Sequence, residues 1–220
     1  MNDGIILIDK PADMTSFGVV ARIRRVLSQR AGKKIKVGHT GTLDPFATGL
    51  MILVTGKECK NASYYTKLDK VYEATFQLGA ISTTGDPEGE VTEVTNGRPP
   101  SREAVEAVLL QFVGDIWQYP PIFSAIKING QRAYKLARDG KEVEIPARQV
   151  KIYSLELLSY AYPEIKVRVH VGSGTYIRSL CVDIGERLGT GAYCAQLRRL
   201  SISGWKVDDA QQLHNFGIEN

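Results

Sequence analysis

The residues best suited to chemistry lie in one glycine-rich stretch, residues 38–49, which reads Gly-His-Thr-Gly-Thr-Leu-Asp-Pro-Phe-Ala-Thr-Gly. Asp44 stands at its centre, and an apolar run over residues 50–54 follows at once. Glycines permit backbone angles that other residues resist and let another molecule approach the main chain. Pro45 biases Asp44 away from helical geometry, so we expect the carboxylate at the end of a turn or the start of a short helix. A loop of this kind before a buried strand is where a rigid scaffold presents a reactive side chain.

Two other interpretations of this loop stay open. Asp followed by Pro commonly starts a helix, with Asp44 as the N-cap and Pro45 in the first helical position. A glycine-rich loop can also cradle a phosphate, although this one lacks the Gly-x-x-x-x-Gly-Lys-Ser/Thr spacing. Taken alone, the loop supports the capping role of Asp44 at least as well as a catalytic one.

Length and composition indicate an ordinary globular protein. A chain of 220 residues can form one large domain or two small ones. No apolar run reaches the length of a membrane span, and the N-terminus lacks a signal pattern, so we expect a cytoplasmic protein with no membrane partner. The three cysteines have no close pairing, as suits a reducing compartment: Cys59, Cys181 and Cys194. The three histidines are scattered, so no metal site is expected: His39, His170 and His214.

The net charge of +4 is small, but the positive charge is clustered. Seven basic residues crowd one short region: Arg22, Arg24, Arg25, Arg30, Lys33, Lys34 and Lys36. Such a patch attracts phosphate backbones, and a solvated helix face explains it equally well.

Hydrophobic periodicity predicts strands and helices in irregular alternation. The expected strands cover residues 4–8, 50–54, 70–78, 148–158, 164–171 and about 193–203. The expected helices cover residues 17–29 with Ser16 as N-cap, 57–68, 102–112 with Ser101 as N-cap, and 176–188. Because the order lacks regular strand–helix–strand units, the fold class is α+β, with a mixed, largely antiparallel sheet flanked by helices.

Residues 118–147 form a distinct block with a positive cast. A strand is predicted over 123–128, a turn at Asn129–Gly130 and a short helix over 131–139. The block has the pattern of a protrusion as much as of a core element.

Several single residues need a separate interpretation. Arg178 lies in the first turn of a predicted helix, where its charge opposes the helix dipole, so a carboxylate partner is expected. Tyr72 shares the apolar face of its strand, where a core aromatic residue is the usual outcome. His170 is expected on the solvent side of its strand, and Cys181 in the core.

The chain resembles the TruB-type tRNA pseudouridine synthases from about residue 4 to about residue 205. Five ordered motifs carry the resemblance, and the central loop with Asp44 is the most specific. The other motifs are Lys10-Pro11 with Thr15-Ser16, Lys70-Val71-Tyr72 with Leu78-Gly79, Gln118 to Lys127, and Gly174 to Leu180 followed by Leu197-Arg198-Arg199.

The resemblance implies a pseudouridine synthase catalytic fold and an isomerase that converts uridine to pseudouridine at position 55 in the T-loop of tRNA, without a cofactor or metal. The family's catalytic aspartate falls on Asp44, its active-site tyrosine on Tyr72, and its active-site arginine, paired to the aspartate, on Arg178. His39 is implied to help hold the flipped-out uridine or the RNA around it. Four further positions are implied to lie near the cleft: Tyr176, Lys10, Lys60 and Leu197.

The chemistry fits these residue types. The uridine must leave the folded RNA to be reached, and Asp44 would then attack either C1′ of the ribose or C6 of uracil. Burial raises the pKa of a carboxyl group and a paired guanidinium lowers it again, which is the physical case for Arg178. Tyr72 would stack on the base and could help to move the C5 proton. The basic residues at 17–36 and the block at 118–147 would grip the phosphates of the T-arm.

The resemblance also sets expectations for domains and partners. Bacterial members commonly carry a small C-terminal RNA-binding domain, which we expect to be absent here, leaving residues 1–220 as a single catalytic domain with an insertion at about 118–147. The family often has small residues before the lysine that falls on Lys60, whereas this chain has Glu58 and Cys59 there. We expect a monomer that acts on tRNA without a guide RNA. The alternatives are a non-catalytic RNA-binding or RNA-folding protein and a guide-RNA-dependent synthase.

Overall fold

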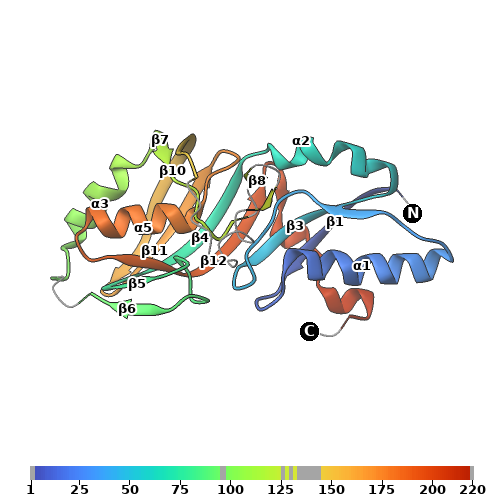
Figure 1. The fold of residues 1–220 in the computed structure, drawn as a ribbon, viewed down its shortest axis with the longest axis horizontal. Coiled ribbons are helices and arrows are strands. Elements are labelled where there is room, and N and C mark those ends of the chain that lie inside the picture. The colour runs from blue at the N-terminus through green and yellow to red at the C-terminus, as the bar shows by residue number, and fades with distance from the viewer. Residues whose placement is uncertain (1–2, 95–97, 125–126, 129–130, 133–144, 219–220) are drawn as a thin grey trace. The chain divides into compact units, whose positions relative to one another are not determined.

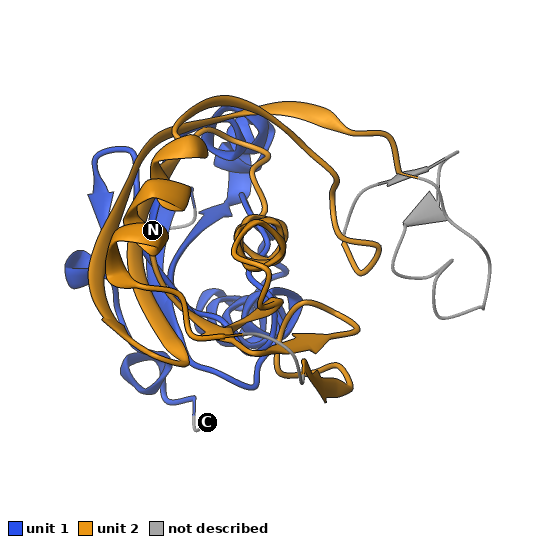
Figure 2. Ribbon diagram, turned by 90° about the vertical axis from the view of Figure 1, so that its left-hand side faces the viewer, with its two compact units in different colours: residues 1–72, 197–220 blue, residues 73–196 orange. Residues whose placement is uncertain are grey.

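The computed structural model describes residues 3–94, 98–124, 127–128, 131–132 and 145–218. These residues form two compact units, one of residues 1–72 with 197–220 and one of residues 73–196 (Figure 2). We call them unit 1 and unit 2 and describe each by itself. Two strands, β4 (Lys70–Leu78) and β12 (Ala192–Ile202), have residues in both units.

Unit 1 is built around strand β3 (Thr48–Thr55) (Figure 1). The residues of β3 from Gly49 to Thr55 are all buried. Strand β1 (Gly4–Lys10) pairs antiparallel with β3 along its whole length. Strand β2 (Val37–His39) pairs antiparallel with the C-terminal half of β3, and β12 pairs in parallel with its beginning. The predicted apolar strand over 50–54 is therefore confirmed, because neighbouring strands cover both of its edges.

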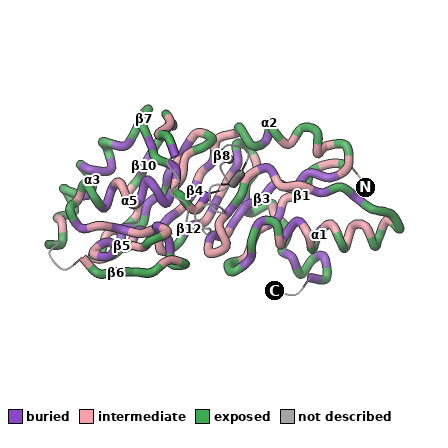
Figure 3. Tube along the Cα trace, viewed as in Figure 1, coloured by how far each residue is buried: buried purple, intermediate pink, exposed green. Residues whose placement is uncertain are grey.

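Helix α1 (Ser16–Ala31) has buried and exposed positions along its length (Figure 3). Val19, Val20 and Ile23 are buried, whereas Arg22, Arg25 and Arg30 are exposed. Its N-cap is Thr15, whose Oγ1 accepts a hydrogen bond of 2.9 Å from the backbone N–H of Gly18. The predicted cap, Ser16, was wrong by one residue, because its buried hydroxyl bonds a distant loop instead. Gly32 ends the helix in the left-handed conformation with φ 62°.

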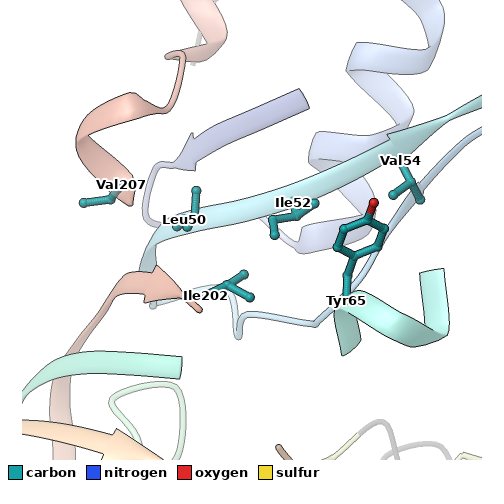
Figure 4. Close-up of a cluster of buried hydrophobic side chains, with 6 residues drawn as sticks. All are labelled: Leu50, Ile52, Val54, Tyr65, Ile202 and Val207. Carbon is teal, nitrogen blue, oxygen red and sulfur yellow. The ribbon is translucent and has the colours of Figure 1, made fainter. Parts of the chain in front are cut away.

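A small apolar cluster packs on one face of β3 (Figure 4). Its buried members are Leu50, Ile52, Val54, Tyr65, Ile202 and Val207. Tyr65 comes from helix α2 (Ala62–Thr66), and its hydroxyl donates a 2.6 Å hydrogen bond to Glu58 in the preceding 3₁₀ helix (Gly56–Asn61). The single helix predicted over 57–68 was therefore partly wrong, since only its second half is α-helical.

The last elements of unit 1 come after β12 in the sequence. Strand β13 (Trp205–Lys206) folds back antiparallel on the end of β12. Two 3₁₀ helices complete the unit, Val207–Asp209 and Leu213–Phe216.

The described part of unit 2 contains a sheet and two α-helices. Hydrogen-bonded strands follow the order β4, β11 (Glu164–Val171), β10 (Arg148–Ala161) and β7 (Gly114–Gln118). The pairs β10–β11 and β10–β7 are antiparallel. Alternate side chains of β11 are fully buried, as its alternating sequence predicts: Ile165, Val167, Val169 and Val171.

Helix α3 (Arg102–Gln111) contacts β10 and helix α5 (Ile177–Arg187). The predicted cap of α3 is confirmed, because the side chain of Ser101 accepts a hydrogen bond from the N–H of Ala104. Strands β5 (Ala80–Ser82) and β6 (Val91–Glu93) form a separate antiparallel pair. Cys181 is buried in α5, as predicted. These features confirm the α+β class with a mixed, largely antiparallel sheet flanked by helices.

The block at 118–147 is described only in part. Strands β8 (Lys127–Ile128) and β9 (Gln131–Arg132) form a short antiparallel pair. The strand predicted over 123–128 was wrong for Phe123 and Ser124, which lie in a bend. The helix predicted over 131–139 begins within β9, so its first two residues are strand instead. The rest of that helix and the turn at Asn129–Gly130 lie outside the described residues, as does most of the expected protruding insertion.

No helix in the described part of the chain is long and apolar enough to cross a membrane.

Candidate active site

The loop that carries Asp44 joins β2 to β3 within unit 1. The N–H of Ala47 donates a 3.2 Å hydrogen bond to the carbonyl of Asp44, which closes a tight turn over Pro45 and Phe46. The next element is strand β3, which begins at Thr48, so no helix follows that Asp44 could cap. The capping interpretation was therefore wrong, and the partly exposed carboxylate stands in a turn before a buried strand.

Lys10 fastens this loop to the N-terminal strand. Its side chain is fully buried, and Nζ donates hydrogen bonds to the carbonyls of Pro11, Met14 and Pro45 at 2.8, 2.6 and 2.9 Å. The contact with Pro45 lies one residue after Asp44. A buried ammonium is tolerated because carbonyl oxygens take the place of its water. The structure therefore gives Lys10 a part in shaping the loop, and its implied contact with RNA stays a prediction.

Ser16 fixes the residue on the other side of Asp44. Its hydroxyl donates to the carbonyl of Leu43 at 2.9 Å and accepts from the N–H of Leu43 at 2.8 Å. Both Ser16 and Leu43 are buried. One side chain thus satisfies both backbone groups of the residue before Asp44, which leaves the loop little freedom to shift.

Arg199 holds the beginning and the end of the same loop. Nε donates to the carbonyl of Leu50 at 2.6 Å, and Nη2 donates to the carbonyl of Gly41 at 3.2 Å. Gly49 lies between them with φ 103°, and a Cβ there would overlap the carbonyl oxygen of Arg199. The strand carrying Arg199 can approach this closely only because position 49 is glycine. Arg199 was part of a motif in the sequence, but the sequence did not indicate this role.

Tyr72 and its neighbour Lys70 lie on β4, and both are buried. The Nζ of Lys70 donates hydrogen bonds to the carbonyls of Thr66 and Leu68, at the end of α2. Burial, and then the nearby charge of Arg199, lower the pKa of Lys70 to about 8. The start of β4 is therefore tied to α2, which fixes the backbone two residues before Tyr72.

Arg178 is the second residue of α5, in unit 2, and only 4% of it is exposed. Its Nη1 lies 3.1 Å from Oδ2 of Asp86, which is also buried. The guanidinium further donates to the carbonyls of Thr84 and Phe123, each at 2.8 Å. The expected carboxylate partner at the helix start is thus confirmed as Asp86, whose negative charge suits the N-terminal end of α5.

Asp86 is the functional candidate that the sequence reasoning missed. Its Oδ1 accepts hydrogen bonds from the hydroxyl of Thr84 at 2.5 Å and the N–H of Glu88 at 3.0 Å. The only signal was its place in the turn Gly85-Asp86-Pro87-Glu88-Gly89, where Asp is common for local reasons. Asp44 belongs to unit 1 and Arg178 to unit 2, so the ion pair between them stays a prediction.

The start of α5 also holds the chain that enters the block at 118–147. The side chain of Gln118 accepts from the N–H of Tyr176 at 2.8 Å and donates to its carbonyl at 3.0 Å. Ser179 donates to the carbonyl of Tyr119 at 2.8 Å. The guanidinium of Arg148 lies 4.9 Å from the centre of the Tyr176 ring. Tyr176 is thus fixed by its backbone while its ring stays partly exposed.

The other predicted site residues occupy separate places. His39 ends β2 opposite Leu53 and is partly exposed. Lys60 is exposed in the 3₁₀ helix before α2, and Leu197 is buried in β12. His170 is partly exposed on β11, with its ring centre 4.6 Å from that of Tyr153. The structure brings the loop around Asp44 together with Lys10, and Arg178 with Asp86, and the roles of the other residues stay predictions.

Two family models match most of the chain. A family model described as "TruB family pseudouridylate synthase (N terminal domain)" matches residues 24–177. A second, described as "tRNA pseudouridylate synthase B C-terminal domain", matches residues 178–217. The expectations of a single domain and of an absent C-terminal RNA-binding domain stay predictions.

Similar proteins include two that are named tRNA pseudouridine synthase B. The one from Opitutus terrae is 44% identical over 211 residues, which cover 96% of this chain and 86% of the relative. The one from Phocaeicola vulgatus is 45% identical over 213 residues, which cover 96% of this chain and 91% of the relative.

Solved structures give a similar fold. A chain in a crystal structure of a Cbf5-Nop10-Gar1 complex is 31% identical, with a TM-score of 0.74 over 97% of this chain and 53% of that chain. A chain of the archaeal box H/ACA sRNP Nop10-Cbf5 complex is 29% identical, with a TM-score of 0.71. The match covers 98% of this chain and 53% of that chain. The present chain spans about half the length of these two structural relatives.

Proposed function

The chain belongs to the TruB family of pseudouridylate synthases, and we propose that it isomerises uridine to pseudouridine at position 55 in the T-loop of tRNA. The observation that carries the proposal is the loop of Asp44, a partly exposed carboxylate flanked by residues whose backbone groups are held by buried side chains. Two similar proteins named tRNA pseudouridine synthase B support tRNA as the substrate.

The reaction sets the demands on Asp44. The bond between ribose C1′ and N1 of uracil breaks, the ring turns, and a bond from C1′ to C5 forms. C5 loses its proton and N1 gains one. The target uridine has to be extruded from the folded RNA to reach a side chain. Asp44 acts as the nucleophile, at C1′ or at C6, and an intermediate of this kind divides a difficult step into two easier ones. Substrate and product have the same atoms, so the isomerisation consumes no oxidant, reductant or group donor.

The proposed role of Arg178 is to keep the nucleophilic carboxylate ionised. A guanidinium close to a buried carboxyl group favours its charged form, and the nucleophile must be charged at neutral pH. In support, the side chain of Arg178 is buried and held in place by Asp86 and two carbonyls. Asp86 is accordingly a positioning residue, which orients Arg178 without touching the substrate.

The other residues receive and hold the RNA. Tyr72 stacks on the uracil ring and takes part in moving the C5 proton. His39, Tyr176, Lys60 and Leu197 contact the flipped uridine or the RNA beside it. Lys10 has the loop-shaping role that its three carbonyl contacts support.

The proposed enzyme works as a monomer in the cytoplasm, on tRNA and without a guide RNA. Two of the structural relatives come from complexes that contain Nop10, and one of these also contains Gar1. Turnover of purified tRNA by the isolated chain would support the guide-free proposal. A requirement for added guide RNA or protein partners would contradict it.

The test is tritium release from tRNA labelled at C5 of uridine. The native chain should release tritium, and Asp44→Asn should not, while it binds tRNA within severalfold of the native affinity. The matched control is Asp115→Asn, which alters an exposed aspartate of β7 and should release tritium at the native rate. A tRNA with cytidine at position 55 should release none.

Each result has a clear meaning. Tritium release by Asp44→Asn would show that the nucleophile is assigned wrongly. Release from the tRNA with cytidine at position 55 would refute the proposed position. Binding of tRNA without release by the native chain would favour a non-catalytic RNA-binding protein.

A further inference from the structure

The positive charge of this chain is concentrated in one continuous segment. The chain has 28 Lys and Arg residues against 24 Asp and Glu residues. Residues 14–43 hold seven of the basic residues and none of the acidic ones. The other 21 basic residues are therefore outnumbered by 24 acidic ones, so the rest of the chain carries a net charge of −3. The protein is basic only because of this segment.

The structure places six of these seven charges in solvent. Arg22, Arg25 and Arg30 are exposed on α1, and Lys33, Lys34 and Lys36 are exposed in the loop that follows it. Arg24 is half-buried. We call the six exposed residues the α1 basic surface.

Within the described residues, no carboxylate lies in ion-pair distance of the α1 basic surface. Some basic residues elsewhere do have an acidic partner: Arg102, Lys166, Arg168 and Arg198. The polar contacts of the surface arginines are with backbone carbonyls: Arg22 with Gly18 and Arg30 with Phe216, each at 3.4 Å. A cluster of like charges without counter-charges repels itself and attracts anions, so a bound anionic partner would stabilise it.

The packing of α1 decides which anionic partner suits it. A basic helix can lie on a membrane when its apolar face is free to enter the lipid. In α1 that face is occupied, because Val19, Val20 and Ile23 are buried in unit 1. Phe17, in the first turn, is the one large apolar side chain of the helix that is mostly exposed, at 66%. Beyond it the helix presents charge and no apolar stripe, which suits a polyanion such as a nucleic acid backbone.

The surface starts beside the catalytic loop and leads away from it. Ser16, in the first turn of α1, bonds Leu43, the residue before Asp44. A helix rises 1.5 Å per residue, so Arg25 lies about 14 Å and Arg30 about 21 Å along the axis from Ser16. A phosphate backbone that runs beside α1 would therefore meet these cations several nucleotides away from the group held at the loop of Asp44.

We infer that the α1 basic surface binds the phosphate backbone of the tRNA substrate, several nucleotides from the uridine held at Asp44. The inference rests on the proposed function in taking tRNA as the RNA. The contact is independent of base sequence, because Lys and Arg side chains neutralise phosphates without reading bases. It supplies affinity and orients the RNA, while discrimination of the target base takes place at the loop of Asp44.

The test compares the salt dependence of tRNA binding in three proteins, all with Asp44→Asn so that the RNA is not converted. One carries no further change. The second carries Arg22→Gln, Arg25→Gln, Lys33→Gln and Lys34→Gln. The third is a matched control that removes four exposed charges elsewhere, Arg102→Gln, Lys166→Gln, Arg187→Gln and Lys206→Gln. Glutamine is a good helix former, so α1 should remain folded, which circular dichroism checks.

Each neutralised phosphate contributes about 0.9 to the slope of log affinity against log salt. The surface variant should lose about 3 from that slope and bind at least about tenfold more weakly at about 0.1 M salt. The matched control should keep the slope of the parent. An equal slope in all three proteins, or an equal loss in both variants, would overturn the inference.

A second arm uses vesicles of phosphatidylserine in place of tRNA. If the surface variant loses vesicle binding and keeps the tRNA slope, the surface serves a membrane and the inference is wrong. Tritium release by the native chain tests the proposed function separately. A reduced slope without tritium release would leave the surface assigned and the proposed reaction refuted.

Discussion

Replacing Ser16 by alanine removes both hydrogen bonds that hold Leu43 next to the proposed nucleophile. The site is buried, with Ser16 2% and Leu43 3% exposed, so water cannot easily replace the lost partner. The backbone N–H and carbonyl of Leu43 would be left unsatisfied. We expect the loop to shift by a fraction of an ångström to recover these bonds, and this shift carries Asp44 with it.

The magnitude follows from the two groups left without a partner. A buried donor or acceptor without a partner costs about 1–3 kcal/mol. Partial relaxation of the loop reduces the sum, so we expect Ser16→Ala to lower the free energy of unfolding by about 2–4 kcal/mol. Displacement of a reacting group by about 1 Å can cost about a hundredfold in rate. We therefore expect kcat to fall by at least about tenfold while the Kd for tRNA changes little.

Ser101→Ala is the matched control. Ser101 accepts a hydrogen bond of 3.2 Å from the N–H of Ala104 and caps α3 in unit 2. Loss of a cap costs about 1 kcal/mol, so this variant should be slightly destabilised and keep the native kcat. Urea unfolding followed by circular dichroism gives the stability of both variants. Tritium release at saturating tRNA, at a temperature where both are folded, gives kcat.

Unchanged kcat in a clearly destabilised Ser16→Ala protein would refute the reasoning, because the loop would then be positioned without this contact. An equal fall in kcat for Ser101→Ala would also refute it, since general destabilisation would then be the cause. A loss of stability below about 1 kcal/mol would show that Leu43 finds other partners.

Two more predictions follow from buried ionisable groups. Asp86→Asn leaves the buried Arg178 guanidinium without its carboxylate partner in unit 2, which should cost about 3–5 kcal/mol in urea unfolding and strongly reduce tritium release. Native stability and turnover in this variant would show that Asp86 does not position Arg178. Burial raises the pKa of Asp183 in α5 to about 6, above the value near 4 of an unfolded chain. Folding therefore favours the protonated form of Asp183. The contribution of this group to the free energy of unfolding is lost as the pH rises from about 4 to 6. Asp183→Asn should raise the melting temperature above pH 6 and leave it unchanged below about pH 4, and equal melting curves at pH 7.5 would contradict this.

Local patterns were enough to predict most of the fold. The strand over 70–78 was predicted with the bounds that the structure gives, because its alternation matches a sheet with one buried face. The cap of α3 and the buried stripe of α5 depend on residues within a few positions of each other, as does the turn signal around Asp44. The family resemblance also rests on short motifs in a fixed order, and the comparisons confirm it.

Contacts between residues far apart in the sequence could not be predicted from local patterns. Thr15 and Ser16 are both plausible caps, and only the packing of α1 against the loop of Asp44 showed that Thr15 caps while Ser16 bonds Leu43, 27 residues away. The ion pair of Arg178 with Asp86 and the clamp of Arg199 on Gly41 join parts of the chain that share no local pattern.

The sequence by itself therefore determined most of the elements and the family, because these depend on local backbone preference and short motifs, and it predicts Asp44 as the reactive carboxylate. Only the tertiary structure decided how that carboxylate is held. A buried polar group has to find a partner wherever the chain brings one, and for Lys10, Ser16 and Arg199 the structure shows where those partners are.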